Sequence, residues 1–283
     1  MRDERQIHLT RRFDWSNLRQ RAMSAGVLAP VAVLALWFGD VAHGAPFLVV
    51  ICAAIALLAN EWSLMSAPSA PLRVALAITV TLLCTVFAGY LDHYGVAWGL
   101  LPVAAVTCGL IARGAAERPA DAAFGVIYLG APCIALTWVR LAAPDGRHWT
   151  ILLLAVTWAA DIGAFAVGNL VGGPKLWPKF SPNKTWSGFL GALIIAMGAS
   201  VTVAFLSHMR LSVGAAALMG LVGGLATMAG DLLESILKRR FGVKDSGDLI
   251  PGHGGLLDRV DGLMFAIMAV AAARLIHLAG WAA

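Results

Sequence analysis

Residues 188–206 read GFLGALIIAMGASVTVAFL, nineteen consecutive residues without a charged side chain. A helix that crosses a bilayer needs roughly 20 mostly apolar residues, so this stretch is long enough to span one. The whole chain has the same character, since 59% of its 283 residues are hydrophobic and only 13% are charged. That charged share is about half the share usual for a soluble domain. We therefore expect a membrane protein.

Further apolar runs of this kind predict about nine spanning helices. Segments that span lipid must be helices or closed barrels, because the backbone has to satisfy its own hydrogen bonds there. These runs are too long and too uniformly apolar for barrel strands. The expected fold class is therefore all-α, a polytopic helical bundle that forms one membrane domain over residues 1–283. The predicted spans are residues 22–38, 46–60, 72–90, 96–112, 122–142, 149–168, 188–206, 211–231 and 260–281.

The distribution of Lys and Arg predicts the orientation of the bundle. With nine spans and a cytoplasmic N-terminus, 17 of the 21 basic residues fall on the cytoplasmic side, including those of the basic segment 1–21. Such an excess is typical of cytoplasmic loops. The net charge of +5 then indicates contact with anionic membrane lipids and no nucleic-acid partner. We expect an integral protein of a bacterial-type inner membrane.

The segment 231–261 carries an unusual density of charge, DLLESILKRRFGVKDSGDLIPGHGGLLDRVD. Asp258 and Asp261 are three residues apart where the last span begins, so they share one face near a positive helix end. At the end of the preceding span, a second polar face is expected from helical spacing, and it comprises Asp231, Glu234, Ser235 and Lys238.

A glycine-rich turn, residues 251–255, lies between these two helix ends. Glycines allow backbone amides to approach a ligand closely and to form an anion-binding nest. Mg²⁺ prefers one or two carboxylates together with substrate phosphates and water, and the basic residues of the segment suit phosphate oxygens. The segment therefore predicts a metal-dependent site for phosphoryl or nucleotidyl transfer on the cytoplasmic side.

A second polar group precedes the run at 188–206. Asp161 lies inside a predicted span, where a charge costs roughly 2.5–3.5 kcal/mol on insertion scales, so it should face a wet cavity or the bundle interior. Ser181, Lys184 and Thr185 stand just before a helix, where a phosphate could bind. Both features have a plainer interpretation. Asp161 could form an ion pair with a basic residue that has only a structural role. The lysines of the loop could serve only to orient the protein in the membrane, and its hydroxyl residues could form an ordinary helix cap.

These segments resemble one enzyme family. The pattern Ser235-x-x-Lys238-Arg239, Lys244-Asp245, Pro251-x-His253-Gly254-Gly255 and Asp258-Arg259-x-Asp261 is similar to the signature of the phosphatidate cytidylyltransferases, also called CDP-diacylglycerol synthases. Residues 161–168 and 181–188 are also similar to stretches of that family, although Phe165 stands where Tyr is common and Ser187 where Glu is common. The resemblance implies a nucleotidyltransferase of phospholipid biosynthesis that transfers CMP from CTP to phosphatidic acid, releasing pyrophosphate. It implies Mg²⁺, with room for a second metal ion, and it is compatible with a homodimer.

The resemblance and the polar clusters together assign hypothetical roles. Catalytic roles are predicted for Asp231, Lys238, Asp258 and Asp261, and metal binding for Asp231, Asp258, Asp261 and Asp161. Substrate binding is predicted for Ser181, Lys184, Thr185, Ser235, Arg239, Lys244, His253, Gly254, Gly255 and Arg259. For His253, bonding to a substrate and bracing of the glycine turn remain equally open.

Two other functions stay open at this stage. An ion-coupled transporter would also have many spans and an intramembrane carboxylate such as Asp161. A transferase acting on another lipid phosphate, such as a polyprenyl phosphate, would share the same site chemistry. Glu61, at the end of the second span, is interpreted as an interface charge, and Arg274 inside the last span has no explanation in the sequence.

Overall fold

The computed structural model describes Trp37 and residues 42–114, 118–142, 145–178, 181–249 and 254–280. Within these ranges the chain forms eight long helices and one short antiparallel hairpin. The helices are α2 (Ala45–Ser66), α3 (Pro71–Tyr90), α4 (Tyr94–Ile111), α5 (Pro119–Leu141), α6 (Gly146–Val171), α7 (Trp186–Leu206), α8 (Val213–Arg240) and α9 (Leu257–Leu278). The hairpin pairs β1 (Lys175–Trp177) with β2 (Ser181–Thr185).

All eight helices are long and apolar enough to cross a membrane. They coincide with the last eight predicted spans, so the helical, polytopic membrane fold is confirmed. Apart from Trp37, the first predicted span, 22–38, and the basic segment 1–21 lie outside the described residues. The count of nine and the cytoplasmic N-terminus therefore stay predictions. The hairpin was not expected, because its strands are too short to show an alternating pattern.

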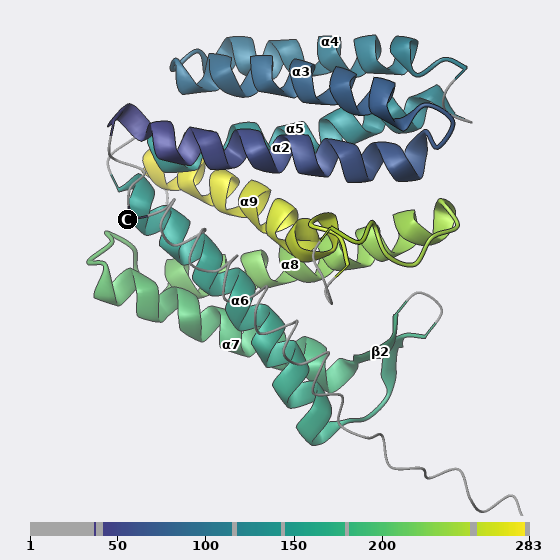
Figure 1. Cartoon of the computed structure of the whole chain (residues 1–283). Coiled ribbons are helices and arrows are strands. Elements are labelled where there is room, and N and C mark those ends of the chain that lie inside the picture. The colour runs from purple at the N-terminus through teal and green to yellow at the C-terminus, as the bar shows by residue number, and fades with distance from the viewer. Residues whose placement is uncertain are drawn as a thin grey trace, which may run out of the picture.

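The helices stack in layers, with α9 at the centre (Figure 1). Helices α3 and α4 lie on one outer side, next to α2 and α5, while α6 and α7 lie on the other. Leu257 and Met264 of α9 belong to an apolar cluster with α2 to α5, whereas Ile267 and Val270 belong to a second cluster with α5 to α8. Helix α9 therefore joins the two halves of the bundle, and the start of α9 lies where both halves can reach it.

Helix α8 is longer than the hydropathy of its sequence predicts. It continues nine residues past the expected end at Asp231, to Arg240. Three basic residues occupy its last turn, where positive charge stabilises the negative end of a helix. In its apolar part, Gly220 and Gly224 pack against α7: a Cβ on Gly220 would lie 2.6 Å from the carbonyl oxygen of Ala196.

Arg274 has a structural explanation. Its side chain is fully buried, and its guanidinium donates hydrogen bonds to the backbone carbonyls of Trp138 (3.3 Å) and Val139. The guanidinium also lies 4.9 Å from the ring centroid of Trp138. The last carbonyls of a helix have no partner within the helix. Arg274 therefore ties α9 to the end of α5, and it does not belong to the polar segments singled out above.

Candidate active site

A cleft of about 510 Å³ opens where α8 ends and α9 begins. Polar residues dominate its lining, and they come from α6, α8, α9 and the segment between α8 and α9. The lining residues are Thr157, Trp158, Asp161, Asp231, Glu234, Lys238, Asp245, Asp258, Arg259, Asp261, Gly262 and Leu263. The structure thus brings together the two acidic helix ends and the intramembrane Asp161 in a single cleft.

Asp231 and Asp261 meet because α8 and α9 cross with almost no space between them. Gly230 sits at the crossing, and a Cβ there would lie 2.5 Å from the carbonyl oxygen of Asp261. From the other side, a Cβ on Gly262 would lie 2.8 Å from a methyl carbon of Thr227. Each glycine is the neighbour of one acidic residue in the sequence. The two glycines therefore set how closely the two carboxylates approach.

We expect Gly230→Ala to lower the nucleotidyl-transfer activity that the sequence predicts for this cleft by about tenfold or more. The added methyl group would force α8 and α9 apart, and overpacking of this kind costs about 1–3 kcal/mol. Thermal unfolding and the rate of product formation measure the two effects. Gly214→Ala is the matched control in the same helix, because a Cβ there meets nothing within 4 Å. If Gly230→Ala behaved like this control, the crossing would not set the geometry of the cleft.

The β hairpin supplies a cation to this acidic group. Lys184 of β2 reaches α8, and its ammonium donates to a carboxylate oxygen of Asp231. Thr185, which ends β2, caps α7, since its hydroxyl accepts from the backbone N–H of Gly188 at 3.1 Å. The hairpin is thus held at the start of α7 while its lysine points to the cleft. For Thr185, the described contacts are those of a helix cap, and its predicted substrate role stays a prediction.

A second ion cluster links the end of α8 with the start of α9. The ammonium of Lys238 lies 2.6 Å from a carboxylate oxygen of Glu234 and 2.6 Å from one of Asp258. Glu234 is 1% exposed, and its other oxygen, Oε1, is buried without a partner among the described residues. A buried carboxylate oxygen that lacks a donor is costly. This oxygen belongs to a residue that lines the cleft, so an added cation or donor there would be favourable.

Asp258 holds the segment that precedes α9. Its Oδ2 accepts from the backbone N–H and the hydroxyl of Ser246, both at 3.0 Å, and from the N–H of Gly255 at 2.9 Å. Its Oδ1 accepts from Lys238. Both oxygens of Asp258 are therefore engaged by the protein in this structure. Metal binding by Asp258 stays a prediction, while its observed contacts are those of a residue that shapes the cleft.

Glu61 supports the candidate active site, and the sequence reasoning did not predict this role. It comes from α2 and is 2% exposed, so its interpretation as an interface charge was wrong. Its carboxylate accepts from the backbone N–H groups of Leu256 and Leu257, each at 2.7 Å, and lies 3.3 Å from the hydroxyl of Ser246. Glu61 therefore caps α9 from another helix. The next residue, Trp62, donates to the carbonyl of Asp121 at 3.0 Å.

The glycine turn packs around these caps. A Cβ on Gly255 would lie 2.0 Å from the hydroxyl oxygen of Ser246, so only glycine fits there. Gly254 has φ +79°, which favours glycine as well. The turn was expected to offer its amides to a substrate phosphate. The amide of Gly255 donates to Asp258, and the amides of Leu256 and Leu257, which follow the turn, donate to Glu61. Phosphate binding by the other amides of the turn stays a prediction. His253 lies outside the described residues.

The remaining predicted site residues divide into two groups. Arg259 lines the cleft as expected. Outside the lining, among the described residues, are Ser181, Ser235, Arg239 and Lys244, of which Arg239 and Lys244 are exposed. Asp245 and Trp158 line the cleft although no site role was predicted for either. The contribution of Trp158 was foreseeable, since it lies three residues, or about one helical turn, before Asp161.

The fold and the cleft together define a polytopic helical membrane protein with a charged cleft suited to anionic substrates. A sequence model described as the Cytidylyltransferase family matches residues 19–277. The chain is 37% identical to the phosphatidate cytidylyltransferase of Brucella suis over 265 residues, 94% of each chain, and equally similar to that of Brucella abortus. It is 40% identical to the one of Staphylococcus haemolyticus over 147 residues, 52% of this chain and 56% of that one.

The chain belongs to the Cytidylyltransferase family. The predicted family, the enzyme class of nucleotidyltransferase and the predicted role in CDP-diacylglycerol synthesis are confirmed by these matches. The alternative of an ion-coupled transporter is thereby set aside.

Proposed function

We propose that the cleft between α6, α8 and α9 is where CMP passes from CTP to phosphatidic acid. The observation that carries this proposal is the convergence of carboxylates and cations at one end of a bundle of apolar helices. A phosphate oxygen of the lipid forms a bond to the α-phosphorus of CTP, and the bond from that phosphorus to pyrophosphate breaks. The lipid phosphate is already an anion near neutral pH, so it needs no strong general base.

The main obstacle to this reaction is repulsion between two polyanions. Lys184, Lys238 and Arg259 offset it from the protein side by contacting phosphate oxygens. Lys184 and Lys238 are each held by carboxylates in this structure, which keeps both ammonium groups ordered at the cleft. Trp158, 43% exposed, adds an aromatic face on which the cytosine ring could stack.

The carboxylates of the cleft suit a divalent cation. Among the described residues, no group of three or more His, Cys, Asp or Glu side chains is arranged as a metal site. Mg²⁺ is usually held by only one or two carboxylates, with phosphate oxygens and water completing its shell. Asp231 and Asp261 fit that requirement, with Asp161 in the same cleft and repelled by Asp231. When bound there, the ion would neutralise charge on the triphosphate and on the departing pyrophosphate.

The position of the cleft also suits a lipid substrate. It lies at the end of the bundle, so acyl chains can stay against the apolar helices while the phosphate enters the cleft. The distribution of Lys and Arg along the sequence supports a cytoplasmic position for this end, on the side where CTP is found. We accordingly propose a site that faces the cytoplasm from an inner membrane. The homodimer stays a prediction.

The test uses purified full-length enzyme in lipid nanodiscs with CTP labelled at the α-phosphate. We expect label to enter the lipid fraction only when phosphatidic acid is present, chelation by EDTA to stop the reaction, and Mg²⁺ to restore it. A polyprenyl phosphate at the same concentration is the control acceptor. Labelling of the polyprenyl phosphate in preference to phosphatidic acid would overturn the proposed substrate, and full activity in EDTA would overturn the metal.

A further inference from the structure

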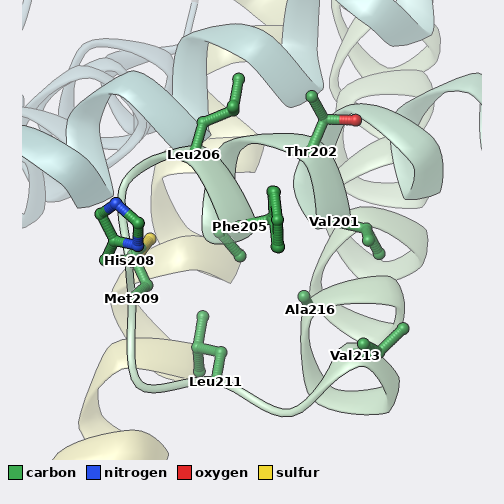
Figure 2. Close-up of a pocket in the computed structure, with 10 residues that line it drawn as sticks. Val201, Thr202, Phe205, Leu206, His208, Met209, Leu211, Val213 and Ala216 are labelled. Atoms are coloured by element: carbon green, nitrogen blue, oxygen red, sulfur yellow. The ribbon is translucent and has the colours of Figure 1, made fainter.

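Two adjoining cavities lie at the other end of the bundle, away from the candidate active site. The first is an apolar groove of about 550 Å³, formed where α7 ends and α8 begins. The second is a polar basin of about 440 Å³. His208 and Met209, in the loop between α7 and α8, line both cavities. Figure 2 shows these two residues at one side of the groove, with Val213 and Ala216 at the other. The two cavities therefore form one continuous surface.

The groove is built to contact hydrocarbon. Phe205, Leu206 and Val213, which line it, have 77%, 68% and 72% of their surface exposed. Thr202 brings the polar hydroxyl drawn in Figure 2, but this hydroxyl donates to the carbonyl of Gly198 at 2.8 Å in its own helix. The groove thus offers apolar side chains in a concave arrangement at a membrane-spanning helix end.

The basin has the opposite chemistry. It is lined by Asp145, Trp149, His208, Met209, Arg210 and His277. The ring of His277 lies 5.6 Å from that of Trp149, centroid to centroid, and its Nδ1 is buried without a hydrogen-bond partner among the described residues. Asp145 already faces another residue, since its Oδ1 lies 3.5 Å from Nδ1 of His148. The basin is therefore lined both by an imidazole whose Nδ1 lacks a partner among the described residues and by the positively charged Arg210.

A metal ion is a poor candidate for this basin. Histidine and aspartate are common metal ligands, yet the guanidinium of Arg210 also lines this basin and would repel a cation. An anion suits the basin better, because Arg210 supplies a fixed positive charge and His277 a spare donor or acceptor. Trp149 is 3% exposed and packs against the ring of His277, so it forms the buried floor of the basin.

We propose that this surface binds a membrane glycerophospholipid of the leaflet on that side. Its phosphodiester would sit in the basin against Arg210 and His277, and one acyl chain would occupy the groove between α7 and α8. A glycerophospholipid suits this surface because it joins an anionic phosphodiester to apolar acyl chains. The surface likewise joins an anion-binding basin to an apolar groove through the residues that line both. The site is distinct from the cleft, which lies at the opposite ends of α8 and α9. It does not depend on the reaction proposed above.

The experiment is photolabelling of the full-length protein in nanodiscs that contain a trace of phosphatidylethanolamine with a diazirine in its acyl chain. Peptide mapping by mass spectrometry then locates the label. We expect residues 201–216 to be labelled more strongly than the other lipid-facing helices. Arg210→Gln and His277→Gln should each lower that labelling by about tenfold, as expected for losing a hydrogen bond to a charged group.

Two further variants separate the parts of the proposal. Thr202→Phe fills the groove without touching the basin, and it should also reduce labelling of residues 201–216. His93→Gln changes an exposed histidine outside both linings, and it should label like the wild type. Equal labelling in wild type, Arg210→Gln and His277→Gln would mean ordinary contact with bulk lipid and would overturn the site. So would labelling of residues 201–216 no stronger than that of other helices.

Discussion

Asp261→Asn should reduce CDP-diacylglycerol formation by roughly 10²–10³-fold, the usual effect of removing one group that stabilises charge in a transition state. Asp261 and Asp231 are the two carboxylates that the glycine crossing of α8 and α9 brings together. The amide keeps the size of the side chain and the oxygen that accepts from the N–H of Gly262 at 2.7 Å. What it removes is the negative charge. The measurement is the steady-state rate in nanodiscs as a function of Mg²⁺ concentration.

The stability of this variant distinguishes a catalytic loss from a folding defect. The charge of Asp261 is repelled by those of Asp231 and Asp161, so removing it should leave the melting temperature unchanged or raise it. Asp248→Asn is the matched control, since Asp248 is exposed and outside the lining of the cleft. Lost activity together with a lowered melting temperature would point to a structural role, and near-normal activity would remove Asp261 from the metal site.

The polar helix ends illustrate what local patterns can predict. Helical spacing predicts one face that comprises Asp231, Glu234, Ser235 and Lys238, and all of these except Ser235 line the cleft. The spacing of Asp258 and Asp261 predicts the same for the start of α9, and it is equally correct. Hydropathy alone predicts that α8 ends at Asp231, which is too early. The prediction assumes that a charged residue marks the edge of the membrane. The charged turns at the end of α8 remain helical because their side chains form ion pairs with other residues of the protein.

Contacts between distant segments could not be predicted in this way. Lys184 and Asp231 are 47 residues apart, and nothing in either segment specifies the other as its partner. The sequence predicts that the backbone amides of the glycine turn bind an anion of the substrate. The amide of Gly255 donates to Asp258, and the next two amides along the chain, those of Leu256 and Leu257, donate to Glu61, so these three acceptors are carboxylates of the protein itself. A sequence pattern shows that donors are available, while the identity of the acceptor depends on the packing of the whole bundle.

Glu61→Ala should be the most damaging single substitution outside the family signature. It would leave the N–H groups of Leu256 and Leu257 without their acceptor and would deprive the Ser246 hydroxyl of a neighbour. Each buried donor left unsatisfied costs about 1–3 kcal/mol, so we expect a loss of about 3 kcal/mol or more of unfolding free energy. Thermal unfolding of the purified protein in detergent measures it.

The same substitution should lower activity, because Glu61 fixes the start of the helix that carries Asp258 and Asp261. Glu61 is a positioning residue that acts from α2 through α9 and lies outside the lining of the cleft.

Glu61→Gln provides the sharper test. Its amide retains one acceptor oxygen but presents an NH₂ group to one of the two N–H donors, so it should lower kcat with a smaller change in KM for CTP. Asn60→Ala, an exposed neighbour on the same helix, should behave like the wild type. If Glu61→Gln retained wild-type kcat and stability, the cap would be dispensable, and the N-terminal half of the chain would serve the site only as a membrane scaffold.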